Sequence, residues 1–129
     1  MDKVVHFEIP SDDIERTKKF YSDTFGWETQ TIPDMNYTML TTVSADENNM
    51  PKESGAINGG MYKRDAGFSK SPVVVIGVAS IEDALKKVQA NGGKVVKDRI
   101  QFGNMGLYAQ VSDTEDNIIG LWQDLSGHQ

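Results

Sequence analysis

The feature that most constrains this sequence is an internal repeat. With a shift of 67 residues, identical residues coincide at five pairs: Ile9 with Ile76, Ile14 with Ile81, Glu15 with Glu82, Lys19 with Lys86, and Gly26 with Gly93. These pairs fall at the end of a predicted strand and at the start and the end of a predicted helix. We therefore interpret the chain as two copies of one supersecondary unit.

Each half shows the pattern β-α-β-β-β. Apolar and polar residues alternate over 4–9, which predicts a strand, and apolar residues at helical spacing predict a helix from Ile14 to Phe25 that ends at Gly26. The other strands of the first half are predicted at 27–32, 37–43 and 56–62, with a polar loop at 44–55. The second half is predicted to have a strand at 73–78, a helix from Ile81 that ends at Gly92-Gly93, and strands at 94–100, 107–111 and 118–123.

The predicted fold is α+β, in a single domain of residues 1–129. Module one covers about 1–62, a polar linker covers 63–72, and module two covers about 73–125. At this length a chain can bury a real core.

Composition excludes several classes of function. Lys plus Arg is 13 and Asp plus Glu is 19, for a net charge of −6. Such a surface repels phosphate backbones and anionic lipid headgroups, so we expect neither nucleic acid nor a membrane as a partner. There is no cysteine, which excludes disulfides, thiolate metal sites and cysteine nucleophiles and fits a reducing compartment. The N-terminus has no signal-peptide pattern, and we expect a cytoplasmic protein.

Short motifs in both halves resemble those of the vicinal oxygen chelate superfamily, which includes glyoxalases, bleomycin-resistance proteins and dioxygenases. The motifs are Val5 to Pro10, Asp13 to Arg16, Phe20-Tyr21, Phe25-Gly26-Trp27, Val78, Ile81-Glu82, Gly92-Gly93, Gly106 and the turn from Asp113 to Asn117, in which Thr114 and Asp116 replace the usual proline and glycine. The resemblance covers nearly the whole chain and implies two βαβββ modules that form curved mixed sheets around a cleft. It is specific for the fold and not for an activity, because the family contains isomerases, dioxygenases, epimerases, transferases and drug binders.

Metal-dependent members of that family hold a divalent metal with two histidines and two carboxylates, or a close variant. The resemblance places these four positions at His6, Gly60, Val73 and Gly120. Only His6 has a donor atom, whereas about three protein ligands are usual in such sites. We therefore expect no metal and no other cofactor, and leave open a weakly held divalent metal at His6 and Glu8. The second histidine, His128, lies in a polar tail.

Strand alternation places His6 and Glu8 on the concave face, while Val5, Phe7 and Ile9 are expected to pack against the helices. With an apolar wall from the second half, this face has the composition of many small-molecule sites. Gly120 would leave space for a flat ligand beside Trp122. The candidate ligand-binding residues are His6, Glu8, Asn58, Gly60, Tyr62, Tyr108, Gly120 and Trp122. For His6 and Glu8 the alternative is a hydrogen-bonded remnant of an ancestral site, and for Trp122 it is burial in the core.

The sequence favours a metal-independent protein that binds a small, partly aromatic or hydrophobic molecule, similar to the drug-binding members of the family. Two alternatives remain open. One is a lyase or isomerase of the glyoxalase type that uses His6 and Glu8 as acid and base, and the other is a dimeric scaffold domain. We expect a homodimer in each case, because the curved sheets need covering and two-fold dimers are the commonest soluble oligomers.

Overall fold

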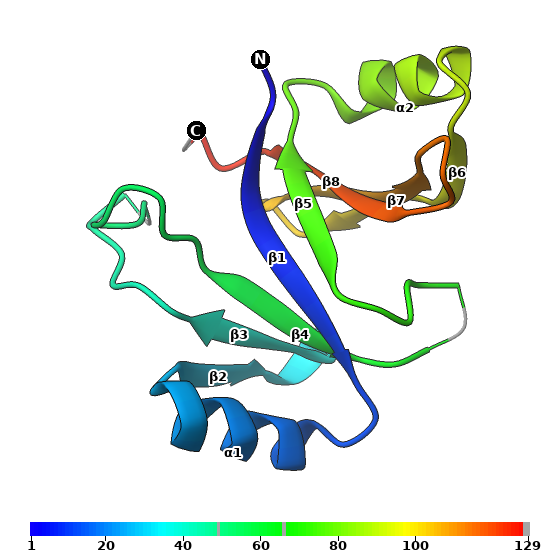
Figure 1. Cartoon of the computed structure of the whole chain (residues 1–129). Helices are drawn as coiled ribbons and strands as arrows, with labels where there is room; N and C mark the ends of the chain where they lie inside the picture. Colours follow the sequence, from blue (N-terminus) through cyan, green and yellow to red (C-terminus); the bar gives the residue numbers. More distant parts are fainter. Residues whose placement is uncertain (49, 66, 128–129) are drawn as a thin grey trace.

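One mixed sheet of eight strands forms the body of the molecule, with both helices on its outer side (Figure 1). The computed structural model describes residues 1–48, 50–65 and 67–127, so His128 lies outside the described residues. The elements are β1 (Lys3–Ser11), α1 (Ile14–Phe25), β2 (Glu28–Ile32), the 3-10 helix η1 (Pro33–Met35), β3 (Tyr37–Thr41), β4 (Gly59–Lys63), β5 (Val73–Gly77), α2 (Ile81–Ala90), β6 (Lys94–Phe102), β7 (Gly106–Ser112) and β8 (Ile118–Asp124). The predicted α+β class and the repeated βαβββ order are confirmed.

The strand order shows how the two halves join. It is β2-β3-β4-β1-β5-β8-β7-β6, so the strands of each half lie together and the first strand of each half lies at the centre. β1 and β5 pair antiparallel, with Glu8 opposite Val73 and His6 opposite Val75. β4 is parallel to β1, and β8 is parallel to β5. The two halves therefore repeat the same arrangement on either side of the central pair.

Both helices begin where the sequence predicts, and α1 also ends there, whereas α2 ends at Ala90, before the predicted Gly92-Gly93. The carboxylate of Asp13 accepts a hydrogen bond from the Arg16 backbone N–H at the start of α1, and Ser80 accepts one from Asp83 at the start of α2. Gly26, after α1, has a φ of 74°, in the left-handed region that favours glycine. Among the described residues, no helix is long and apolar enough to cross a membrane.

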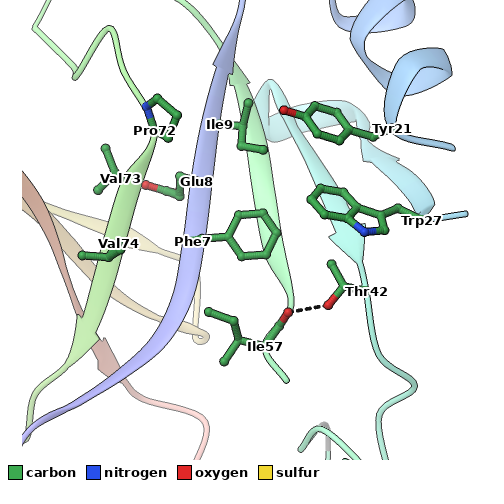
Figure 2. A pocket seen from close by; sticks show the side chains of 10 residues that line it. All are labelled: Phe7, Glu8, Ile9, Tyr21, Trp27, Thr42, Ile57, Pro72, Val73 and Val74. Carbon is green, nitrogen blue, oxygen red and sulfur yellow. Dashed lines mark hydrogen bonds between the residues drawn. The ribbon is translucent and has the colours of Figure 1, made fainter. Parts of the chain in front are cut away.

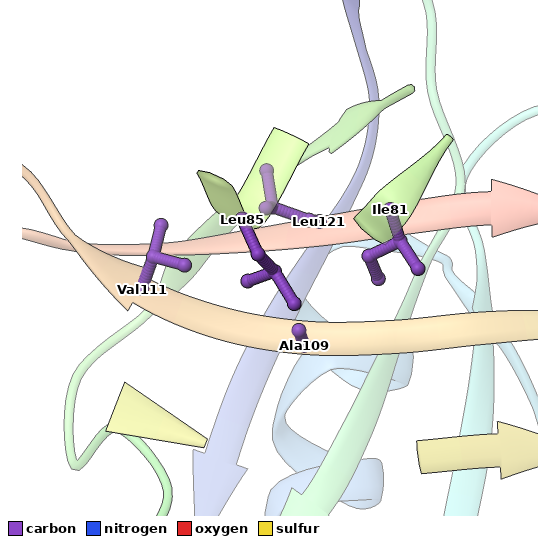
Figure 3. Packing of buried hydrophobic residues seen from close by; sticks show 5 residues of the cluster. All are labelled: Ile81, Leu85, Ala109, Val111 and Leu121. Carbon is purple, nitrogen blue, oxygen red and sulfur yellow. The ribbon is translucent and has the colours of Figure 1, made fainter. Parts of the chain in front are cut away.

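The two helices differ in how well they are packed. α2 covers β7 and β8 over a cluster of buried apolar residues (Figure 3), which are Ile81, Leu85, Ala109, Val111 and Leu121. α1 buries none of its residues, and Phe20 and Phe25 remain 55% and 61% exposed.

Two predictions about the first half need adjustment, one on the packing of β1 and one on the start of β4. The ring of Phe7 packs against Trp27 at a centroid distance of 5.5 Å, as expected for this side of β1. Val5 remains 43% exposed, which is contrary to the expected packing against a helix. The fourth strand begins at Gly59 rather than at residue 56, because the side chain of Asn58 binds the backbone of the neighbouring segment.

Candidate functional site

The candidate site lies on the inner face of the sheet, which we define as the face opposite the two helices. On β7, Ala109 belongs to the cluster beneath α2, so Tyr108 and Gln110 point to the inner face. On β1, Phe7 points to the outer side, as Figure 2 shows, and Glu8 points away from it. Strand alternation therefore places the predicted polar residues of β1 together with those of β7.

Glu8 is the centre of a buried hydrogen-bonded network on the inner face. It is only 5% exposed. The Tyr37 hydroxyl donates to Oε2 of Glu8 at 3.1 Å, and the Tyr108 hydroxyl donates to Oε1. Nε2 of His6 lies 2.8 Å from the Tyr37 hydroxyl oxygen. Histidine and glutamate of the first half are thus joined through a tyrosine from β3.

The network continues from Tyr108 to the segment that connects the two halves. Nε2 of Gln110 donates to the Tyr108 hydroxyl at 2.7 Å, and Oε1 of Gln110 accepts from the Ser69 backbone N–H at 2.8 Å. The Tyr62 hydroxyl donates to the Ser69 carbonyl at 2.8 Å. Among the described residues, no buried polar side-chain atom lacks a partner.

The contact between Tyr108 and Glu8 shows how strongly the sheet curves. Their strands, β7 and β1, are separated by β8 and β5. Three strand spacings correspond to roughly 14 Å in a flat sheet, where side chains stand nearly perpendicular to the sheet and would not meet. Curvature brings the second half over the first and encloses the inner face.

Two glycines create the space that the tyrosines occupy. A Cβ atom on Gly60 would lie 1.6 Å from the hydroxyl oxygen of Tyr37. A Cβ atom on Gly120 would lie 2.9 Å from Cγ2 of Val75 and 3.2 Å from Cε1 of Tyr108. The expectation that Gly120 leaves open space for a flat ligand is therefore wrong, because the ring of Tyr108 fills that space.

The two tyrosines occupy equivalent places in the two halves. Tyr37 on β3 lies opposite Tyr62 on β4, and Tyr108 on β7 lies opposite Trp122 on β8. Each tyrosine reaches past the glycine of its own half toward the central strands. The internal repeat thus extends to the inner face, although the sequence analysis did not include Tyr37 among the site residues.

Burial determines the protonation of the network. It lowers the pKa of His6 from 6.5 to about 4, which makes the ring neutral at neutral pH. Burial raises the pKa of Glu8, and the hydrogen bonds from Tyr108 and Tyr37 oppose that rise. The pKa values of Tyr37 and Tyr108 are raised by burial and by the Glu8 carboxylate, so both hydroxyls keep their protons.

The residues at the four family ligand positions do not fit a metal. The space beside Gly60 and beside Gly120, where a ligand side chain would extend, is filled by Tyr37 and Tyr108. Val73 has no donor atom. Nε2 of His6 and both carboxylate oxygens of Glu8 already take part in hydrogen bonds. Within the described part of the chain, no group of three His, Cys, Asp or Glu residues could hold a metal ion.

A cavity of about 460 Å³ lies where the two ends of the sheet meet. Its lining comes from η1 with the residue after it, and from the end of β6 with the turn that follows: Asp34, Met35, Asn36, Gln101, Phe102, Gly103 and Met105. β2 and β6 are the edge strands of the sheet, so a shared cavity shows that the edges approach each other. Phe102 joins this cavity to the inner face, because its ring lies 6.4 Å from those of Tyr108 and Trp122. We call this cavity the mouth.

A second hollow, of about 470 Å³, lies beside α1 and is mostly apolar (Figure 2). Phe7, Ile9, Tyr21 and Trp27 line it on the outer side of the first half. Glu8 also borders it, but the polar groups of that side chain are turned to the tyrosines of the inner face. The mouth is therefore the better candidate for a site related to the polar network.

The remaining predicted site residues have structural partners. Oδ1 of Asn58 accepts from the backbone N–H groups of Thr42 and Val43, and its side-chain amide donates to the Val43 carbonyl. Tyr62 is bonded to Ser69. Trp122 packs against the buried cluster of Val73, Val75 and Tyr108. The inner face thus brings together seven of the eight predicted residues, and Asn58 instead anchors the end of β3.

Comparison with known proteins identifies the family. Residues 3–43 match the model of the bleomycin resistance protein-like N-terminal region. A glyoxylase-like domain-containing protein from Didymella fabae is 34% identical over 117 residues, which are 85% of this chain and 84% of that protein.

Solved structures share the fold. A variant of methylmalonyl-CoA epimerase from Streptomyces coelicolor, in complex with 2-nitronate-propionyl-CoA, has a TM-score of 0.65 at 15% identity, covering 98% of this chain and 97% of that chain. A glyoxalase/bleomycin resistance protein/dioxygenase superfamily member from Vibrio splendidus has a TM-score of 0.62 at 17% identity, covering 96% and 100%. This chain belongs to the glyoxalase/bleomycin resistance protein/dioxygenase superfamily, the vicinal oxygen chelate proteins.

Proposed function

We propose that this protein binds a small, partly hydrophobic molecule without a metal, at the mouth and the inner face behind it. The observation that carries the proposal is the mouth itself. It combines an aromatic ring and two methionines with amide side chains, and its volume of about 460 Å³ is within the range of small-molecule sites. Methionine adapts to ligands of different shape, which suits a binding protein.

The polar network supports binding rather than metal chemistry. The groups that a metal would need are engaged with Tyr37 and Tyr108. A divalent ion would have to displace both phenols from Glu8 and would gain only two protein ligands, His6 and Glu8. Three are usual when a site keeps an open position for substrate.

The experiment is a thermal-shift screen with small aromatic compounds, because a ligand that binds only the folded state raises the melting temperature. The variant Met105→Glu places a charge at the mouth, at a side chain that is 55% exposed. Met50→Glu is the matched control, since Met50 is also exposed and lies in another loop. Binding should be lost in the first variant and kept in the second. Equal binding by both variants would place the ligand elsewhere.

A second candidate function is an acid–base reaction of the lyase or isomerase type. One observation favours it: a neutral histidine is linked through Tyr37 to a buried carboxylate, and neutral imidazole is a suitable general base. The test is exchange of carbon-bound hydrogen with deuterium from the solvent in small carbonyl compounds. Exchange that is lost in His6→Gln would support the reaction, and no exchange above the protein-free rate would exclude it for those compounds.

We also propose that the protein works as a homodimer. The support is the poor covering of the first half: α1 buries no residue, and Phe20, Phe25 and Val74 are exposed beside the apolar hollow. A second copy would cover this surface as α2 covers the second half. Light scattering should give about twice the chain mass of 14.3 kDa. A single chain mass at micromolar concentration would contradict the proposal.

A further inference from the structure

In each hydrogen bond of the network on the inner face, the donor can be assigned. The assignment starts from the backbone N–H of Ser69. The Ser69 N–H can only donate, so it fixes the oxygen of the Gln110 side-chain amide as its acceptor. The amide nitrogen then points to Tyr108. A side-chain NH₂ group can only donate, so the Tyr108 oxygen accepts from Gln110.

The same reasoning assigns the donors of the hydrogen bonds to the Glu8 carboxylate. Tyr108 has one hydroxyl proton, and its remaining partner is Oε1 of Glu8, so this proton is donated to Glu8. With an ionised Glu8, Tyr37 must also donate its only proton, to Oε2. The Tyr37 oxygen then accepts from Nε2 of His6. The proton of the neutral imidazole therefore lies on Nε2.

The other ring nitrogen of His6 remains as an acceptor. Nδ1 has no hydrogen bond to any described residue, because the only bond of the ring is to Tyr37. No buried polar side-chain atom of the described residues lacks a partner, so Nδ1 is accessible to solvent. The network thus leaves one lone pair of the His6 ring without a partner among the described residues.

We propose that Nδ1 of His6 accepts a hydrogen bond from the ligand, and that the ligand is a neutral molecule with an O–H or N–H group rather than a carboxylate or a phosphate. This inference rests on the proposed small-molecule site. An anion would meet a lone pair on Nδ1 with the Glu8 carboxylate behind it, and the net charge of −6 adds to this repulsion. An alcohol, a phenol or an amide N–H would instead complete the network.

Nitrogen-15 NMR tests the assignment of donors without any ligand. In uniformly labelled protein at neutral pH, two-bond correlations from the ring protons distinguish a protonated Nε2 from a protonated Nδ1. The chain has two histidines, and the variant His128→Gln assigns the signals. His6 should carry its proton on Nε2. A proton on Nδ1 would overturn the inference.

Glu8→Gln provides a sharper test, because it should reverse part of the network. Tyr108 still has to donate to residue 8, so the new amide must turn its oxygen to Tyr108 and its NH₂ to Tyr37. Tyr37 then donates to Nε2 of His6, and the imidazole proton should move to Nδ1. Glu82→Gln on α2 is the control, since this exposed carboxylate lies outside the network and its variant should leave the Nε2 proton in place. If Glu8→Gln does not fold, Tyr37→Phe should abolish the preference for Nε2. No change of His6 in either network variant would contradict the proposed assignment of donors.

Two matched probes test the ligand class. Benzyl alcohol and benzoate have the same ring, and the first donates a hydrogen bond while the second only accepts. We expect the wild type to bind benzyl alcohol at least about tenfold more tightly, which corresponds to about 1.4 kcal/mol, and Glu8→Gln to reduce this ratio. Equal binding of both probes would overturn the ligand class alone. Binding of neither probe would overturn the proposed binding site, and with it the ligand class.

Discussion

Gly60 and Tyr37 share one space: a Cβ atom on the glycine would lie 1.6 Å from the tyrosine hydroxyl oxygen. The position at which metal-binding relatives carry a ligand therefore has no side chain here, and a phenol from the next strand reaches across it to Glu8. The same relation holds more loosely for Gly120 and Tyr108. At two of the four positions where the resemblance would place a metal ligand, a tyrosine from the next strand thus takes the space beside a glycine.

Gly60→Ala should destabilise the protein, because the added methyl group forces Tyr37 away from Glu8. Overpacking of this kind costs about 1–3 kcal/mol. Urea unfolding of Gly60→Ala, Tyr37→Ala and the double variant measures the coupling. In the Tyr37→Ala background, Gly60→Ala should lower the free energy of unfolding by clearly less. An equal cost in both backgrounds would show that the tyrosine is not the obstacle.

Tyr108→Phe should be more destabilising than Tyr62→Phe. The Tyr108 hydroxyl both donates to Glu8 and accepts from Gln110, so its removal leaves two buried groups without partners, at about 1–3 kcal/mol each. The Tyr62 hydroxyl donates to the Ser69 carbonyl and also interacts with the Gln110 side chain. Gln110 keeps Tyr108 as a partner when the Tyr62 hydroxyl is removed, so this loss should cost about 1 kcal/mol. Denaturant midpoints of the two variants provide the comparison. A larger loss in Tyr62→Phe would contradict the central role of the Glu8 network.

His6 should make the folded protein sensitive to acid. Burial lowers the pKa of His6 from 6.5 to about 4, so its contribution to stability is fully present above pH 6.5 and is lost as the pH falls through about 4. The loss amounts to about 3 kcal/mol at most. The raised pKa of Glu8 acts in the opposite direction, because protonation of Glu8 favours the folded state.

The measurement that isolates the histidine is the difference in unfolding free energy between wild type and His6→Gln. This difference should shrink or change sign in favour of the variant between pH 6.5 and 4. Glu8 remains in both proteins, so most of its own pH dependence cancels. A difference that stays constant over this range would mean that His6 is not buried as described.

Chelation should leave the fold and the melting temperature unchanged. Gly60, Val73 and Gly120 offer no donor, and His6 and Glu8 are bonded to tyrosines. Elemental analysis of the purified protein, and melting curves with and without EDTA, provide the check. About one equivalent of zinc, nickel, iron or manganese per chain, lost together with stability on chelation, would contradict this prediction.

The sequence predicted the fold well because the fold depends on local patterns. Alternation over 4–9, helical spacing from Ile14, and capping at Asp13 and Gly26 are properties of neighbouring residues, and they coincide with β1 and α1. The internal repeat then supplied the second half. Strand ends were less well predicted, since the end of β3 and the start of β4 depend on a long-range contact, the binding of Thr42 and Val43 by Asn58.

The site was predicted only in part, because it depends on the curvature of the eight-stranded sheet. Alternation predicted that Glu8 and Phe7 lie on opposite faces of β1, as they do. No local signal connects Tyr37 or Tyr108 to Glu8, since they lie on strands that come close only in the curved sheet. A possible signal was the placement of a tyrosine diagonally opposite a strand glycine in each half, a pattern that becomes visible once strand pairing is known.

The central position of β1 affects how the chain can fold. This first strand pairs only with β4 and β5, which begin at Gly59 and Val73. During synthesis β1 can therefore be paired on both edges only after both later segments have been made, whereas α2 packs against β7 and β8, which lie nearby in the sequence. Non-local pairing of this kind slows folding. We expect the second half to become ordered first and β1 to complete the sheet, so that amides of β1 gain hydrogen-exchange protection later than those of β7.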